Sequence, residues 1–349
     1  MAKEIVLALD AMGGDYAPEV VVRGANLARI RYPGLRFLLF GDEARLAPLL
    51  SRFKRLAGDT EIRHADEVIA SDEKPVVALR QLRDSSMRRA VDAVHSGEAA
   101  GVVSAGNTGA LMALAKVVIK TLPGISRPAF ASTFPTQRGE SVMLDLGANI
   151  ECDAENLVQF AVMGEVFART VLGRQRPIIG LLNVGAEELK GTERLQEAAI
   201  RLHESELPIE FHGFVEGNDI AEGTVDVIVT DGFTGNVALK TAEGVAVLYT
   251  EYLRAAFRRS IISRLGYLLA RPALRHFRDR VDPRRYNGAT LLGLNGVVVK
   301  SHGGTDHKGF ANAIGVAVDM ISEGFNAKIT DELHRLHADH APEPATVAL

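Results

Sequence analysis

The stretch "GVVSAGNTGALMALAK", residues 101–116, decides the fold class of this 349-residue chain. It opens on a short apolar run that is typical of a buried strand, and it returns to helical spacing in "GALMALAK". Ser104, Gly106, Asn107, Thr108 and Gly109 lie between the two. Small hydroxyl and amide residues before a helix let an anion approach the backbone N–H groups there. A helix cap without any ligand has the same composition, so both interpretations stay open.

The same strand–turn–helix pattern recurs along the chain. The runs are "EIVLALD" (4–10), "RFLLFGD" (36–42), "VMLDLG" (142–147), "PIIGLLNVG" (177–185), "IEFHGF" (209–214) and "VDVIVTDG" (225–232). Helical patterns follow the first two, "PEVVVRGANLARI" (18–30) and "EARLAPLL" (43–50). This alternation predicts one α/β domain over residues 1–349, with a three-layer α/β/α architecture and a largely parallel sheet. In such sheets ligands bind beyond the carboxyl ends of the strands.

Composition excludes several classes of protein. Hydrophobic residues make up 47% of the chain, enough for a large core, and the net charge of −4 argues against non-specific nucleic-acid binding. A single cysteine, Cys152, excludes an internal disulfide and a four-cysteine metal site, and the ten histidines show no metal-binding spacing. The start of the chain has no signal-peptide layout, and no apolar run is long enough to cross a membrane. We therefore expect a cytoplasmic protein.

Four further post-strand turns carry candidate site residues. They are "DAMGGDYAPE" (10–19) with Gly13 and Gly14, "DLGANIE" (145–151) with Asn149 at its polar tip, "LLNVGAEELKGTE" (181–193) with Lys190, and "VTDGFTGN" (229–236) with Thr234, Gly235 and Asn236. We expect all of them to line one edge of the sheet with Ser104–Gly109. A lone lysine is usually a solvated charge, but the turn-like neighbours favour a place for Lys190 over the sheet edge. Asp231 is interpreted as a helix cap rather than a catalytic group.

Common catalytic signatures are absent from the sequence. There is no G-x-x-x-x-G-K-[ST] loop, no G-x-G-x-x-G after a strand, no H-E-x-x-H and no G-x-S-x-G. The turns offer amides, hydroxyls, an asparagine and a lysine instead of an obvious nucleophile. Such groups suit the positioning of a phosphate and the stabilisation of an oxyanion.

Six motifs together resemble the bacterial fatty-acyl-carrier-protein:phosphate acyltransferase family. In order, they are "ALDAMGGDYAPEVVVRGA", "SAGNTGALMA", "DLGAN", "LLNVGAEELKG", "DGFTGNVALKTAEG" and "SHGGTD", spread over roughly residues 4–325. The resemblance implies a relative of the phosphotransacetylases and of the isocitrate and isopropylmalate dehydrogenase fold. It implies that acyl-carrier protein and inorganic phosphate are the substrates and that acyl phosphate is made for membrane phospholipid synthesis. It also implies a homodimer, with no metal or organic cofactor.

The resemblance also suggests roles for single residues. Because phosphate is itself the nucleophile, the protein has to hold it against a thioester carbonyl and stabilise the oxyanion. Lys190 and Asn236 match the positions that do this, by charge and by an orienting amide. The phosphate-binding or substrate-binding residues would be Gly13, Gly14, Ser104, Gly106, Asn107, Thr108, Gly109, Asn149, Thr234 and Gly235.

Residues 254–285 form a strongly basic window. They include ten arginines, no lysine and two acids, about +8 against about −12 for the rest of the chain. Pro272 predicts two helices joined near Leu269–Pro272, in a hairpin that projects from the α/β body. Arg258, Ile261, Arg264, Leu265 and Leu268 would contact a membrane surface or the acidic carrier protein, near a membrane glycerol-phosphate acyltransferase.

The alternative for this window is a dimer-packing hairpin with a solvated basic face, to which the apolar stretch 243–257 would contribute. Peripheral membrane association is therefore a hypothesis at this stage. Residues 338–349, rich in small residues and proline, are expected to form a flexible tail.

Three other functions stay open. A phosphotransacylase that uses acyl-CoA would perform the same chemistry, but no adenine pocket is identifiable, and the basic window favours the carrier protein. A metal- and NAD-dependent decarboxylating dehydrogenase of the same fold would need an aspartate cluster and a dinucleotide site. A non-catalytic membrane scaffold would leave the post-strand turns without a purpose.

Overall fold

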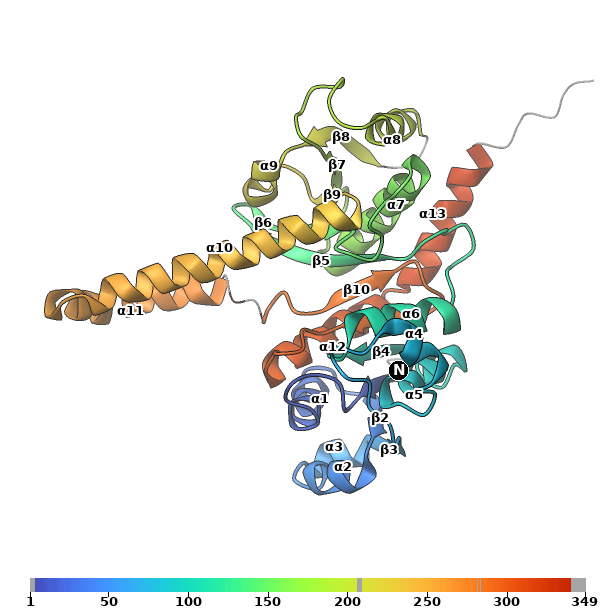
Figure 1. Cartoon of the computed structure of the whole chain (residues 1–349), viewed down its shortest axis with the longest axis vertical. Helices are drawn as coiled ribbons and strands as arrows, with labels where there is room; N and C mark the ends of the chain where they lie inside the picture. Colours follow the sequence, from blue (N-terminus) through green and yellow to red (C-terminus); the bar gives the residue numbers. More distant parts are fainter. Residues whose placement is uncertain (1–3, 206–208, 281, 283, 340–349) are drawn as a thin grey trace, which may run out of the picture.

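The computed structural model describes residues 4–205, 209–280, 282 and 284–339. Within them, eleven strands form one sheet in the order β3-β2-β1-β4-β11-β10-β5-β6-β9-β7-β8 (Figure 1). The strands are β1 Ile5–Asp10, β2 Leu35–Gly41, β3 Thr60–His64, β4 Gly101–Ser104, β5 Ala129–Thr136, β6 Gly139–Leu144, β7 Ile178–Leu182, β8 Glu210–Val215, β9 Val227–Val229, β10 Ala289–Leu292 and β11 Val297–Lys300. Each expected strand is present, and β3, β5, β10 and β11 are additional.

Two parallel halves make up this sheet. Strands β3, β2, β1, β4 and β11 run parallel to one another, and so do β6, β9, β7 and β8. Between the halves, β10 is antiparallel to both β11 and β5, and β5 is antiparallel to β6. The largely parallel sheet is therefore confirmed, but the direction of the strands is reversed from one half to the other.

Helices cover both faces of the sheet. They are α1 Glu19–Arg31, α2 Glu43–Leu50, α3 Lys54–Gly58, α4 Pro75–Arg80, α5 Ser86–His95, α6 Thr108–Val118, α7 Ala154–Val171, α8 Glu193–Glu204, α9 Gly217–Glu222, α10 Gly232–Arg258, α11 Ile261–Arg280, α12 His307–Ser322 and α13 Phe325–Asp339. Leu7 and Leu9 of β1 pack in one core with α1, α7 and α12, while Ala8 packs in the other with α5 and α6. This alternation is the reason for three layers, as the sequence pattern predicts.

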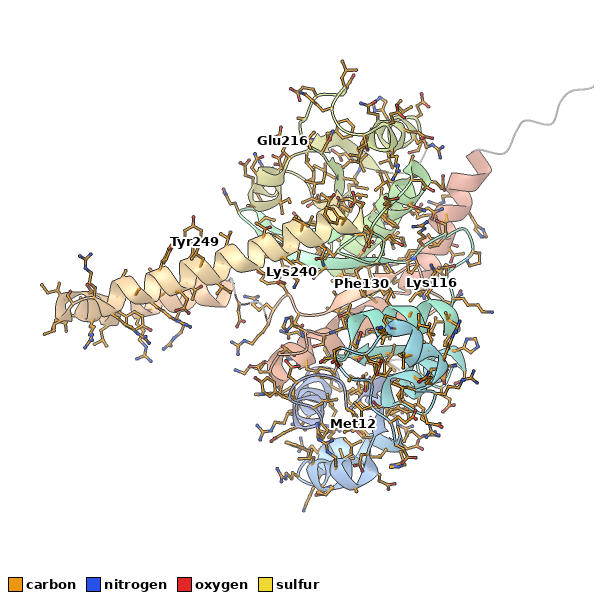
Figure 2. The ribbon with its side chains drawn as sticks, in the orientation of Figure 1. Met12, Lys116, Phe130, Glu216, Lys240 and Tyr249 are labelled. Atoms are coloured by element: carbon orange, nitrogen blue, oxygen red, sulfur yellow. The ribbon has the colours of Figure 1, made fainter. Side chains whose placement is uncertain are left out.

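Helices α10 and α11 form a hairpin that projects from the α/β body (Figure 1). Their side chains stand clear of the sheet, as at Tyr249 (Figure 2). The two helices pack against each other, with the rings of Phe257 and Tyr267 5.3 Å apart. The projecting hairpin is thus present, and it is longer than the basic window.

The expected junction near Leu269–Pro272 is wrong. The chain turns at Arg259–Ser260, where Ser260 Oγ accepts a hydrogen bond of 3.0 Å from Ser263 N, and Pro272 lies inside α11. A serine cap starts a helix strongly. A proline removes a single N–H donor, and in an exposed helix water can bind the carbonyl that loses its partner.

The C-terminal region ends in α13, which includes Ala338 and Asp339. The rest of the predicted tail, residues 340–349, lies outside the described residues. None of the described helices is long and apolar enough to cross a membrane.

Candidate functional site

A buried carboxylate organises the end of β1. Asp10 is 1% exposed and accepts hydrogen bonds from Ser86 Oγ at 2.6 Å and from Ser104 Oγ at 2.7 Å. Burial raises the pKa of Asp10, and these hydroxyl donors act in the opposite direction. A Cβ on Gly13 would lie 2.3 Å from Asp10 Oδ2, so only glycine fits there. Gly13 therefore packs on this carboxylate beneath the turn, and its contact with a ligand stays a prediction.

The Ser104–Gly109 turn begins α6. Gly106 N donates to Ser104 Oγ at 3.0 Å, and Asn107 Oδ1 caps the helix by accepting from Ala110 N at 3.0 Å. The Asn107 amide donates to the carbonyls of residues 70, 71 and 73. The Asn107 side chain thus holds a neighbouring loop. The backbone amides of Thr108 and Gly109, in the exposed first turn of α6, are the candidate anion donors.

Lys300 is a site residue that the sequence reading missed. It ends β11, in register with Ser104, and its Nζ donates to Ala105 O at 3.4 Å and to Ser301 O. The residue is 9% exposed, and burial lowers the pKa of its ammonium to about 8, against the opposing effect of Asp10 and Asp15. The run "GVVVKSH" (296–302) has the same strand-then-polar pattern as the other turns, and this signal could have revealed it.

The turn after β11 also contacts the turn after β1. Asp15 N donates to Gly303 O at 3.0 Å, and a Cβ on Gly14 would lie 2.9 Å from Ala105 Cβ. The ends of β1, β4 and β11 therefore form one compact unit. We call Asp10, Ser86, Ser104 and Lys300, with the first turn of α6, the Asp10 cluster.

A second buried carboxylate, Asp145, organises the end of β6. Its Oδ1 accepts from Phe130 N at 2.9 Å and from Ala148 N at 3.0 Å, and burial raises its pKa. The Asn149 amide donates to Pro128 O at 2.8 Å and to Asp145 Oδ2 at 2.9 Å. Asn149 is buried, so its expected place as a polar tip is wrong. Its amide forms hydrogen bonds within the protein because the turn folds back on the Asp145 carboxylate.

The first turn of α10 packs on this carboxylate. Asp231 caps the helix, as expected, by accepting from Thr234 N at 2.8 Å and from Thr234 Oγ1 at 2.9 Å. A Cβ on Gly235 would lie 2.0 Å from Asp145 O, so a side chain there would push α10 away. Asn236 is exposed, and its Nδ2 donates to Leu146 O at 3.1 Å. Its Oδ1 accepts no hydrogen bond within the described part of the chain, so it is available to a ligand.

Lys190 lies on the exposed turn after β7. Asn183 fixes this turn, because its Nδ2 donates to Lys190 O at 3.1 Å and its Oδ1 accepts from Val184 N at 2.8 Å. In the same parallel half of the sheet, β9 pairs with β6 and β7 pairs with β9. Lys190, Asn236 and Asp145 therefore belong to one edge, and we call them, with Asn149 and Asn183, the Asp145 cluster.

The expectation that all the turns line one edge is wrong. The Asp10 cluster follows β1, β4 and β11, whereas the Asp145 cluster follows β6, β7 and β9, which run in the opposite direction. Within one chain the two clusters therefore lie at opposite edges of the sheet, with β10 and β5 between the strands that carry them. Post-strand motifs alone do not reveal such a reversal.

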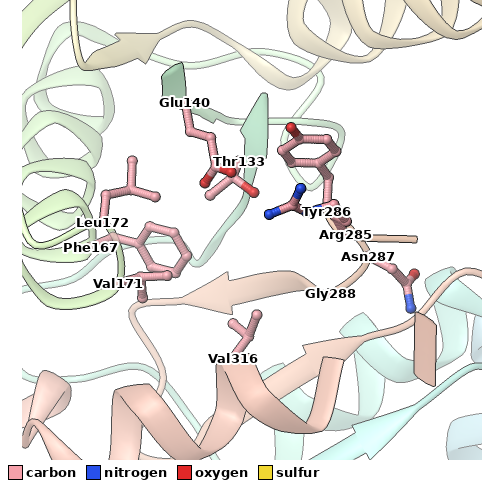
Figure 3. A pocket seen from close by; sticks show the side chains of 10 residues that line it. All are labelled: Thr133, Glu140, Phe167, Val171, Leu172, Arg285, Tyr286, Asn287, Gly288 and Val316. Atoms are coloured by element: carbon pink, nitrogen blue, oxygen red, sulfur yellow. The ribbon is translucent and has the colours of Figure 1, made fainter. Parts of the chain in front are cut away.

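A small cavity lies beside the Asp10 cluster, between α7, α12 and the segment before β10 (Figure 3). Its volume is about 110 Å³, and its lining is Thr133, Glu140, Phe167, Val171, Leu172, Arg285, Tyr286, Asn287, Gly288 and Val316. Asn287 Nδ2 also donates to Ser301 Oγ at 2.8 Å, next to Lys300. The cavity has space for only about four water molecules, far less than a fatty acyl chain needs.

Metal-binding groups were sought across the described part of the chain. No group of three or more His, Cys, Asp or Glu residues in it is placed to hold a metal ion. The groups available for chemistry in both clusters are therefore amides, hydroxyls, carboxylates and lysines.

Comparison with known proteins identifies the family. Residues 5–328 match the family model described as "Fatty acid synthesis protein". Phosphate acyltransferase from Rhodospirillum centenum is 64% identical over 338 residues, covering 97% of this chain and 95% of that protein. The chain belongs to the phosphate acyltransferase family. The enzyme of the same name from Rhodospirillum rubrum is 58% identical, over 100% of this chain and 99% of its own length.

Proteins outside this family share the fold. A phosphotransacetylase from Streptococcus pyogenes superposes with a TM-score of 0.63 at 18% identity, over 92% of this chain and 95% of that chain. At this level of identity the likeness concerns the fold. The expected resemblance in fold to the phosphotransacetylases is confirmed. The chain is thus an acyltransferase of lipid synthesis, as a member of the phosphate acyltransferase family.

Proposed function

We propose that the chain transfers a fatty acyl group from acyl-carrier protein to inorganic phosphate, giving an acyl phosphate for membrane phospholipid synthesis. The observation that carries the proposal is a set of fixed amides and lysines without an activated nucleophile. The lone thiol, Cys152, is buried, and burial raises its pKa to about 12. A phosphate oxygen therefore attacks the thioester carbon itself, the C–S bond breaks, and the carrier leaves as a thiol after it takes up a proton.

Each cluster has a separate part in this reaction. Phosphate binds at the first turn of α6, where Thr108 and Gly109 present backbone amides and Ser104 and Gly106 shape the turn. Lys190 supplies charge to the phosphate or the oxyanion, and the Asn236 amide orients the thioester. Thr234 and Gly235 hold Asn236 in place through their contacts with Asp231 and Asp145.

Two copies of the chain are needed to combine these parts. Because one chain places the clusters at opposite edges, we propose a homodimer in which the Asp145 cluster of one copy meets the Asp10 cluster of the other. Helix α10 supports this proposal with a row of apolar side chains that one copy leaves substantially exposed. They are Val245, Val247, Leu248, Tyr249, Tyr252 and Leu253.

The hairpin has its own proposed partners. Ile261, Leu265 and Leu268 are 76%, 60% and 65% exposed, and Arg258 and Arg264 are exposed beside them. Apolar side chains with flanking arginines suit an anionic membrane surface, where each arginine contributes about 1 kcal/mol. Peripheral binding would release the apolar product beside a membrane acyltransferase that acts on glycerol phosphate. The same arginines attract the acidic carrier protein before turnover.

An assay of thiol release tests the proposal. Palmitoyl-acyl-carrier protein should release free thiol only when inorganic phosphate is present, and acyl phosphate should accumulate in equal amount. The same assay with palmitoyl-CoA as the donor separates the two carriers. Faster turnover with the CoA thioester would assign the chain to the CoA-dependent phosphotransacylases instead.

A further inference from the structure

Lys300 is a buried cation directly beneath the turn that begins α6. We infer that Lys300 supplies the positive charge that holds inorganic phosphate at the amides of Thr108 and Gly109. This inference rests on the proposed function for the identity of the anion. It adds a phosphate-binding residue from β11, a strand outside the motifs that suggested Lys190 and Asn236.

The hydrogen bonds of Lys300 place its charge at the turn. Nζ binds the carbonyl of Ala105, the residue between Ser104 and Gly106, and the carbonyl of Ser301. An ammonium carries three N–H donors, and these two are the acceptors it has within the described chain. A buried charge acts over several ångströms in the low dielectric of the interior. Through the Ala105 carbonyl, the ammonium therefore lies against the backbone that leads into the first turn of α6.

Neutralising Asp10 is the competing role for this ammonium. Within the described chain, Asp10 accepts hydrogen bonds from two hydroxyls and from backbone amides. Its negative charge also acts to raise the pKa of Lys300. If Lys300 only balanced this carboxylate, loss of either charge would alter stability and leave phosphate affinity unchanged. If Lys300 binds phosphate, loss of Lys300 weakens phosphate binding much more than Asp10→Asn does.

Direct titration with inorganic phosphate tests the inference without any acyl donor. By calorimetry, Lys300→Met should bind phosphate at least tenfold more weakly, and Lys300→Arg should recover part of the affinity. Lys308→Met, which removes an exposed lysine from the same region, is the control for net charge. In the turnover assay Lys300→Met should raise KM for phosphate and leave KM for the acyl thioester unchanged. Wild-type phosphate affinity in Lys300→Met would overturn the inference.

Two further measurements cover the case in which Lys300→Met does not fold. The double variant Asp10→Asn/Lys300→Met removes both buried charges, so it should fold. Its affinity for phosphate should be as low as the affinity expected for Lys300→Met. In the wild type, phosphate affinity should fall between about pH 7 and 9, as the pH passes the Lys300 pKa of about 8 and the ammonium loses its proton. The charged groups that act on it are Asp10 and Asp15. A flat profile would overturn the inference, whereas phosphate binding without acyl transfer would contradict only the proposed function.

Discussion

Ser104 Oγ donates a hydrogen bond of 2.7 Å to Asp10 Oδ2, and this bond joins the carboxyl ends of β1 and β4 inside the protein. Ser104→Ala leaves a buried carboxylate oxygen without this donor. The free energy of unfolding should fall by about 1–3 kcal/mol, measured by urea denaturation. Ser96→Ala, at the exposed C-terminus of α5, is the matched control and should change stability by less than about 0.5 kcal/mol. Equal effects of the two changes would mean that the Asp10 bond is not important for stability.

Lys190→Ala and Asn236→Ala test the catalytic assignment. Each should lower kcat on the order of a hundredfold, because each removes a donor to the developing oxyanion. Both side chains are exposed, so circular dichroism and melting temperature should match the wild type. Lys328→Ala, at a partly exposed lysine of α13 outside both clusters, serves as the control. Near-normal turnover in either variant would remove that residue from the mechanism.

Thr108→Pro removes one backbone donor at the proposed phosphate site. Thr108 is the first residue of α6, where proline is tolerated, and the extended backbone of Asn107 is compatible with a following proline. The fold should remain intact while KM for phosphate rises at least tenfold. An unchanged KM would show that this amide does not bind the substrate.

Mixed dimers test whether the two clusters meet between copies. Thr108→Pro and Asn236→Ala copies, each nearly inactive, are denatured together and refolded in equal amounts. If one substrate lies between two copies, each mixed dimer contains one unaltered site, and about a quarter of wild-type activity should return. Wild-type copies refolded in the same way give the reference value. No recovery from a proven mixed dimer would place both clusters of a site in one chain.

Glutamates on the hairpin test the membrane contact. Ile261→Glu/Leu265→Glu/Leu268→Glu should abolish sedimentation with anionic vesicles and leave kcat unchanged at saturating soluble acyl-carrier protein, because these residues lie on the projecting hairpin, outside both clusters. The control triple variant Ile30→Glu/Val68→Glu/Val117→Glu adds the same charge at exposed apolar positions elsewhere. Vesicle binding that survives the hairpin changes would exclude this contact. Loss of the dimer would indicate a packing role instead.

Local sequence patterns determined much of the secondary structure of this protein. The run "EARLAPLL" predicts a helix over 43–50, which is the extent of α2, and "EIVLALD" predicts β1 to within one residue. Asp231 was predictable as a cap because a carboxylate before a helix accepts from the amides of its first turn. These features depend on residues that are close together in the sequence, so the sequence alone is enough to predict them.

Only the tertiary structure decided how the turns are arranged. The antiparallel strands β5 and β10 reverse one half of the sheet, and this pairing joins segments more than a hundred residues apart. It therefore separates Asn236 from Ser104, although their motifs look alike. Lys300 becomes part of a site because β11 pairs with β4 in register with Ser104, and Asn149 becomes buried because its turn folds back onto Asp145. Pairing register and burial arise from long-range packing, which local composition does not encode.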